Sequence, residues 1–102
     1  MINQEIKAIG IAWYRREDYP ALLSIFTDAS SLYRDYDSWL KKAEDLVNQI
    51  TASGKRAIKA EINPNDFPGW CRDRGIDIDA NARNRFANEF AFRTINLEIN
   101  RT

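Results

Sequence analysis

The hydrophobic positions of this chain follow a strand pattern and then a helix pattern, and this order occurs twice. Residues 6–14 are largely apolar at both even and odd positions, which is typical of a strand covered on two faces. Residues 58–62 alternate between apolar and polar side chains, so this second strand should expose one face to solvent. Apolar residues at helical spacing follow each strand: Tyr19, Leu22, Leu23 and Phe26, then Phe67, Trp70 and Cys71.

Two segments of the sequence align without a gap at an offset of 48 residues. Residues 12–23 match residues 60–71, and alanine, aspartate and proline recur at the same places in both. The shared face of the two strands then consists of Gly10, Ala12, Tyr14, Ile58, Ala60 and Ile62. Halves that cannot bury their apolar faces alone must pack on each other, so we expect two similar halves, about residues 1–54 and 55–102.

Two longer helices complete the pattern. The first has one apolar stripe: Tyr36, Trp39, Leu40, Ala43, Val47 and Ile50, with Leu46 on its flank. Asp35 or Asp37 can cap its start, and Gly54 is placed to end it. The second begins at about Asp79, with Ala82, Phe86, Phe90 and Ala91 inward. Residues 95–99 alternate between apolar and polar side chains, and they fit either a helix end or a short strand.

These elements predict one α+β domain over residues 1–102, with a small sheet and helices packed on it in two strand-helix-helix halves. If a pseudo-twofold axis relates the two strands, they run antiparallel. A two-stranded sheet is marginally stable alone, so helix packing must supply most of the stability, and Trp39 should lie in the core.

The composition limits the class of protein, its binding partners and its cellular compartment. Apolar residues make up 44% of the 102 residues, which is ordinary for a globular domain. Fifteen basic residues balance fifteen acidic ones, so no strong field attracts nucleic acid or an anionic membrane. One cysteine, no visible secretory signal and no membrane-length apolar run indicate a cytoplasmic protein without a membrane partner.

A charged cluster at the exit of the first strand is a candidate ligand site. Arg15, Arg16, Glu17 and Asp18 stand where a strand leads into a helix, and ligands tend to bind at such junctions in open sheets. The arginines could hold an anion, with Glu17 or Asp18 as a base. The simpler interpretation is that Asp18 caps the helix that contains Pro20. In the second half, Asn63 or Asp66 could cap in the same way.

Three other groups of residues have a simpler structural explanation. Asp77, Asp79 and Asn81 have the first spacings of a calcium loop, but Ala82 stands where the loop needs glycine. Cys71 lies on an apolar stripe, and the sequence contains no histidine to activate it. Acidic residues interrupt the arginines of the second half: Arg72, Arg74, Arg83, Arg85 and Arg93. We therefore expect no catalytic residue, metal or cofactor, and we keep nucleic-acid binding by these arginines as a second alternative.

The abundant aromatic residues, together with the lack of catalytic patterns, predict a non-catalytic binding or protein-interaction module. The alternative is a small-ligand enzyme at the Arg15–Asp18 site. We also expect a homodimer, with another protein as an alternative partner. The first strand carries Ile9, Ile11 and Trp13 on a face without an apolar counterpart, and these residues, with Tyr33 or Phe92 nearby, would form the interface. The rival explanation is that residues 95–99 fold back over this face.

Several short strings resemble a group of small uncharacterised bacterial proteins, a domain of unknown function. They begin with Trp13-Tyr14-Arg15 and Glu17-Asp18-Tyr19, and continue with Trp39-Leu40-Lys41-Lys42-Ala43-Glu44. The strings Phe67-Pro68-Gly69-Trp70-Cys71 and Arg85-Phe86-Ala87-Asn88-Glu89 follow in the same order. The resemblance implies a small bacterial protein, and it assigns no activity.

Overall fold

The computed structural model describes residues 7–100. Its elements are β1 (Ala8–Trp13), α1 (Tyr19–Ile25), α2 (Tyr36–Ala52), β2 (Arg56–Glu61), α3 (Phe67–Arg74) and α4 (Ala80–Ile99). Short 3-10 turns lie at Arg16–Asp18 and Ala29–Ser31. This order confirms the α+β class with two strand-helix-helix segments, while the predicted strand start at Ile6 lies outside the described residues.

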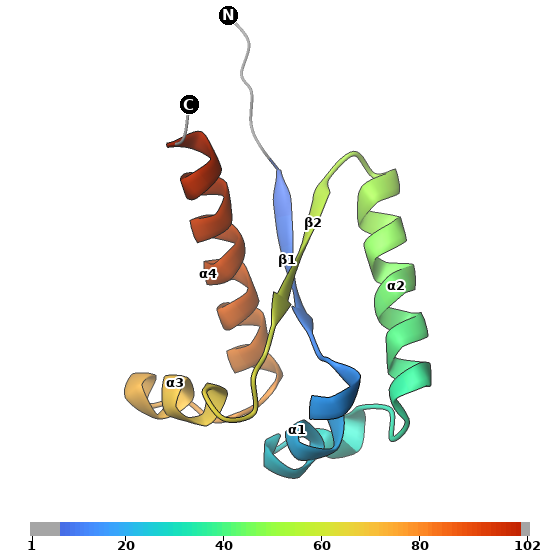
Figure 1. Cartoon of the computed structure of the whole chain (residues 1–102), viewed down its shortest axis with the longest axis vertical. Coiled ribbons are helices and arrows are strands. Elements are labelled where there is room, and N and C mark those ends of the chain that lie inside the picture. Colours follow the sequence, from blue (N-terminus) through green and yellow to red (C-terminus); the bar gives the residue numbers. More distant parts are fainter. Residues whose placement is uncertain (1–6, 101–102) are drawn as a thin grey trace, which may run out of the picture.

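The two strands form the middle of three layers (Figure 1). Helix α4 covers one face of the sheet, where its backbone at Ala87 lies directly on Gly10. Helix α2 covers the other face, where the ring centroid of Trp39 lies 5.2 Å from that of Trp13. The shorter helices α1 and α3 lie at the end of the sheet where both strands finish.

Strands β1 and β2 run parallel, so the antiparallel arrangement is wrong. The chain leaves β1 at one end of the sheet, and α2 carries it back to the opposite end before β2 begins. A helical crossover of this kind joins parallel strands, whereas antiparallel neighbours need only a short hairpin. The register places Ala8 opposite Arg56 and Trp13 opposite Glu61, so strand residues 48 apart in the sequence are neighbours in the sheet.

The two faces of the sheet are covered unequally. Ile58 and Ala60 are buried while Lys59 and Glu61 are exposed, which confirms the one-sided burial predicted for the second strand. The prediction that the other face of β1 is left uncovered is wrong for two of its three residues. Ile11 is 8% and Trp13 9% exposed, because α2 packs against them. Ile9 is partly buried beside the same cluster.

Side-chain caps fix the two long helices but not the two short ones. Asp35 accepts a hydrogen bond from the Ser38 amide at 2.8 Å, and Asp79 accepts one from the Ala82 amide at 3.0 Å. Asp18 precedes α1 without capping it, because its carboxylate accepts from Arg15 at 3.2 Å instead. Asp66 precedes α3 and likewise makes no side-chain cap.

Residues 95–99 form the last turns of α4. Ala87, Ala91 and Ile95 stand four residues apart on the side of the helix that faces β1, so helical packing explains the apolar positions of this segment. The rival explanation that residues 95–99 fold back over the face with Ile9, Ile11 and Trp13 is therefore wrong, since α2 covers that face.

Candidate functional site

The candidate site is the edge of β1 that does not pair with β2. The carbonyl oxygens of Lys7 and Trp13 accept hydrogen bonds from the amides of Arg56 and Ile62, so odd-numbered residues of β1 face β2. Backbone groups alternate between the two edges of a strand. The amides and carbonyls of Ala8, Gly10 and Ala12 therefore point away from β2, to an edge that no other strand of the described chain covers.

This edge lies in a groove of about 640 Å³ between α2 and α4. Residues 9–12 of β1 form its floor. Ala43, Leu46 and Ile50 line the α2 side, and Ala80 and Asn84 line the α4 side. The side chain of Leu46 is 44% exposed and that of Tyr33, at one end of the groove, 47%. Two large apolar side chains that are exposed thus line the groove that holds the open strand edge.

A glycine allows α4 to approach the strand this closely. A Cβ atom at Gly10 would overlap the carbonyl oxygen of Ala87, so a residue without a side chain is required there. Ala8, one position from the groove floor, borders a second hollow together with Asn88, Phe92 and Ile95 of α4. Helix α4 therefore follows β1 along its whole length and forms a wall beside the open edge.

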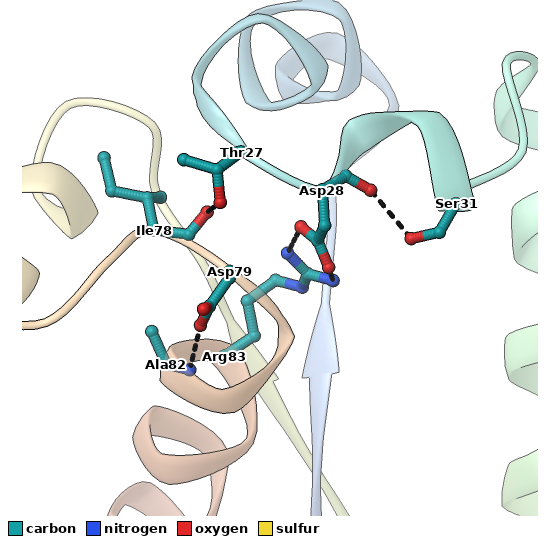
Figure 2. A network of polar contacts seen from close by, with 7 residues as sticks. All are labelled: Thr27, Asp28, Ser31, Ile78, Asp79, Ala82 and Arg83. Carbon is teal, nitrogen blue, oxygen red and sulfur yellow. Dashed lines mark hydrogen bonds and ion pairs between the residues drawn. The ribbon is translucent and has the colours of Figure 1, made fainter.

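A partly buried ion pair between Arg83, which lines the groove, and Asp28 lies near the end of β1 (Figure 2). The Arg83 guanidinium donates to both carboxylate oxygens of Asp28, at 2.7 and 2.9 Å. Arg83 is 6% exposed, and its guanidinium lies 4.4 Å from the centroid of the Phe26 ring. The hydrogen bonds from Arg83 hold the pKa of the Asp28 carboxyl below its usual value. Nearby, the Thr27 amide donates to the Ile78 carbonyl at 2.9 Å, so the two halves of the chain are joined here.

Tyrosine residues support the chain near the same end of β1. The Tyr36 hydroxyl donates to the Tyr14 carbonyl at 2.8 Å, and the Tyr19 hydroxyl donates to the Tyr33 carbonyl. Burial raises the pKa of Tyr14 to about 12, and the positive charge of Arg83 opposes part of this rise. The groove therefore combines an open strand edge, apolar residues of α2 and an arginine, Arg83, that is already paired with a carboxylate.

In the predicted Arg15–Asp18 cluster, the first three residues are exposed and Asp18 is partly buried. Arg15 lies 3.2 Å from Asp18 and 3.4 Å from Glu17, and Arg16 lies 2.7 Å from Asp37. These carboxylates raise the pKa of both arginines. Both arginines are thus already paired with carboxylates, and none of the four predicted residues lines the groove. Anion binding there stays a prediction.

The other candidate residues are also engaged in the fold. Arg74 lies 4.0 Å from the Trp70 ring centroid, and both Arg74 and Arg85 pair with Glu89, at 3.8 and 3.2 Å. Cys71 is 1% exposed, and burial raises the pKa of its thiol. Within residues 7–100, no group of three or more His, Cys, Asp and Glu side chains is placed to hold a metal ion.

Sequence reasoning missed the groove and the ion pair beside it. A signal for Arg83 was present, because Arg83, Ala87 and Ala91 share one side of α4 and the two alanines are buried. A charged residue on a buried stripe of this kind requires a partner of opposite charge. The sequence does not indicate that this partner is Asp28, 55 positions away.

Fold and groove together define a small α+β domain whose β1 edge is accessible between two helices. Residues 5–100 match the family model of a domain of unknown function, DUF8829, and the chain belongs to this family. Searches of curated proteins and of solved structures found no match. The match confirms the resemblance to proteins of unknown function, while the bacterial source stays a prediction. In the described part of the chain, every helix is too short or too polar to cross a membrane.

Proposed function

We propose that this chain is a non-catalytic protein-interaction module that binds an extended segment of another polypeptide along the open edge of β1. The observation that supports this function is the position of the edge, on the floor of a groove with an apolar wall. A segment that enters such a groove adds a strand to the sheet. Its main-chain hydrogen bonds supply affinity, and pockets for alternate side chains supply specificity.

The contrast between the two outer strand edges favours β1 as the binding edge. Strand β2 carries three exposed charged residues, Arg56, Lys59 and Glu61. Charges on an edge strand are a common protection against unwanted pairing. Strand β1 has the sequence Ala-Ile-Gly-Ile-Ala-Trp, with no charge and no proline. An edge without protection at the floor of a groove is expected where pairing is the function.

A pair of proline variants tests the proposal. The chain is used to select binders from a random peptide library, and the binders are then measured against Ala12→Pro and Ala57→Pro. Ala12→Pro removes an amide that points into the groove, whereas Ala57→Pro removes one from the outer edge of β2. We expect Ala12→Pro to weaken the selected peptides at least tenfold and Ala57→Pro to leave them unchanged. Peptides that bind both variants as well as the parent chain would refute the function.

The geometry supports the alternative functions less well. A small-ligand site at Arg15 and Arg16 would have to displace the carboxylates that already pair with these arginines. Nucleic-acid binding by the second half would have to free Arg74 and Arg85 from Glu89. Both remain predictions, and salt-dependent retention of an oligonucleotide would support the second.

The setting of this function rests on sequence features. We propose that the chain works in the bacterial cytoplasm, because its single cysteine fits a reducing compartment and its motifs resemble those of small bacterial proteins. Fractionation of a source organism with an antibody against the chain would test this location. Recovery in the membrane or extracellular fraction would contradict it.

A further inference from the structure

We infer that the groove takes a lone, otherwise unstructured segment with an apolar side chain at every second position, and neither a second copy of this chain nor the sheet edge of a folded domain. The inference rests on the proposed function and specifies the partner. It follows from the two helical walls beside the β1 edge, because these walls limit both the thickness of the partner and the side chains that it presents.

The α4 wall opposes a second copy that pairs edge to edge. Helix α4 lies directly on β1 at Gly10, where its Ala87 carbonyl leaves no room for a Cβ atom. Two β1 strands paired through their open edges would lie about 4.8 Å apart. Each would carry its own α4, and packed helices need about 8–10 Å between their axes. Because α4 packs mainly over β1, the two copies of α4 would come close to each other, so we expect them to oppose an antiparallel dimer through β1.

A folded domain with helices on its edge strand meets the same obstacle. The α2 wall projects beside the groove through Leu46, Lys42 and Gln49, and the α4 wall through Asn84. A sheet edge covered by further layers would collide with one wall or the other. A single extended segment carries no such layer. Such a segment loses conformational entropy when it binds, so the affinity expected for it is modest.

The two walls differ in character and so specify an alternating pattern. Odd-numbered residues of β1 face α2, where Ala43, Leu46 and Ile50 line the groove. The polar residues of this wall, Lys42, Asp45 and Gln49, are exposed, so the inner part of this side is apolar. Even-numbered residues face α4, where the Ala87 backbone lies against Gly10 and where Ala80 and Asn84 line the groove, so this side is narrow and carries one polar side chain. Side chains of a neighbouring strand follow the same alternation. The bound segment therefore presents apolar residues toward α2, with small or polar residues between them.

Charge and length complete the description of the partner. Lys42 and Asp45 carry opposite charges along the α2 side, and Asp28 neutralises Arg83. A groove with balanced charge selects an uncharged segment over an acidic or basic one. Strand β1 has 6 residues. At about 3.3 Å per residue, the segment that pairs with it is also about six residues long.

The experiment compares two capped peptides of identical composition on the full chain. One alternates, Ser-Val-Ser-Leu-Ser-Val-Ser, and the other is its block isomer, Ser-Ser-Val-Leu-Val-Ser-Ser. Binding is measured by titration of the ¹⁵N-labelled protein, in which the amide signals of Gly10 and Ala12 report directly on the strand edge. We expect the alternating peptide to shift these two signals and to bind at least tenfold more tightly than its isomer.

Two leucine variants provide a matched pair for the wall. Leu46→Asp changes an exposed residue of the groove, and Leu97→Asp changes an exposed residue of α4 that does not line it. We expect at least a tenfold loss of affinity for the first and no loss for the second. Because both side chains are exposed, both variants should fold, and their amide spectra verify this.

Three results would overturn the inference. The first is equal binding of the two peptides, and the second is no binding of the alternating peptide at millimolar concentration. The third is a dimer in sedimentation equilibrium that Ala12→Pro dissociates. Each of these results leaves the proposed function standing if library-selected peptides still lose affinity with Ala12→Pro. If Ala12→Pro leaves the affinity of the selected peptides unchanged, the proposed function itself is refuted.

Discussion

The ion pair between Asp28 and Arg83 should be among the largest polar contributions to stability in this chain. In the parent chain, Arg83 donates hydrogen bonds to both carboxylate oxygens of Asp28, at 2.7 and 2.9 Å. Asp28→Asn removes the negative charge and leaves the Arg83 guanidinium without its counter-ion. A hydrogen bond to a charged group contributes about 1.5–3 kcal/mol net. Breaking a fully buried ion pair costs about 3–5 kcal/mol. Because the Asp28 side chain is 28% exposed, we expect the lower end of both ranges, about 3 kcal/mol.

Urea unfolding, followed through the fluorescence of the three tryptophans, measures this loss. With a denaturant slope of about 1.5–2 kcal/mol per molar, the unfolding midpoint should fall by roughly 1.5–2 M. Asp37→Asn is the matched control, because Asp37 pairs with Arg16 at the same 2.7 Å while both side chains are exposed. The control should leave the midpoint almost unchanged. Equal shifts for the two variants would refute the argument from burial.

The stabilisation by this ion pair should also depend on pH in a defined direction. Arg83 lowers the pKa of Asp28 in the folded chain, so the stabilisation is complete above the unfolded value of about 3.9. It is lost as the pH falls through the lower folded value. The parent chain and Asp28→Asn should therefore differ most near neutral pH and converge in acid. A gap that stays constant down to acid would show that charge is not the cause. The double variant Asp28→Leu, Arg83→Met should recover much of the loss, because no unpaired charge remains.

Two further predictions concern the floor and the end of the groove. Gly10→Ala forces a Cβ atom against the Ala87 carbonyl and should cost about 1–3 kcal/mol in thermal unfolding, whereas Gly69→Ala, which meets only the flexible Arg72 side chain, should cost far less. Equal losses would mean that α4 adjusts its position freely. Tyr14 has a pKa of about 12, so stability should hold below pH 10 and fall by roughly 2 kcal/mol as the pH rises to 12. Tyr14→Phe should remove the latest step from the tyrosinate absorbance titration, and an unchanged titration would contradict the assignment.

The sequence was sufficient to predict features that depend on local periodicity. The stripe that includes Trp39, Ala43 and Ile50 is set by helical spacing, and all three residues are buried as expected. The alternation of Ile58, Lys59 and Ala60 likewise predicted which side of β2 is covered. In such cases, the residues that decide the structure lie within a few positions of each other, so one segment contains the whole signal.

Features that depend on distant contacts were not predictable in the same way. The direction of the strand pair is set by the path of α2 between them, and the pattern within each strand is compatible with either direction. The prediction of an uncovered face around Ile11 and Trp13 is wrong for the same reason, because α2, which lies outside the strand, covers this face. The groove exists because α2 and α4 lie apart on either side of β1. This distance depends on the packing of the whole chain, so no single segment of the sequence predicts it.

The parallel pairing of strands 48 residues apart has a consequence for synthesis of the chain. Ribosomes add about 5–20 residues per second, so β1 emerges roughly 2–10 s before its partner strand. During this interval β1 exposes an apolar strand with both edges unpaired, which is a template for aggregation. Closure of the long intervening loop then adds a further entropic cost before any pairing is gained. The nascent first half of this protein should therefore depend on chaperones more than the mature fold would suggest.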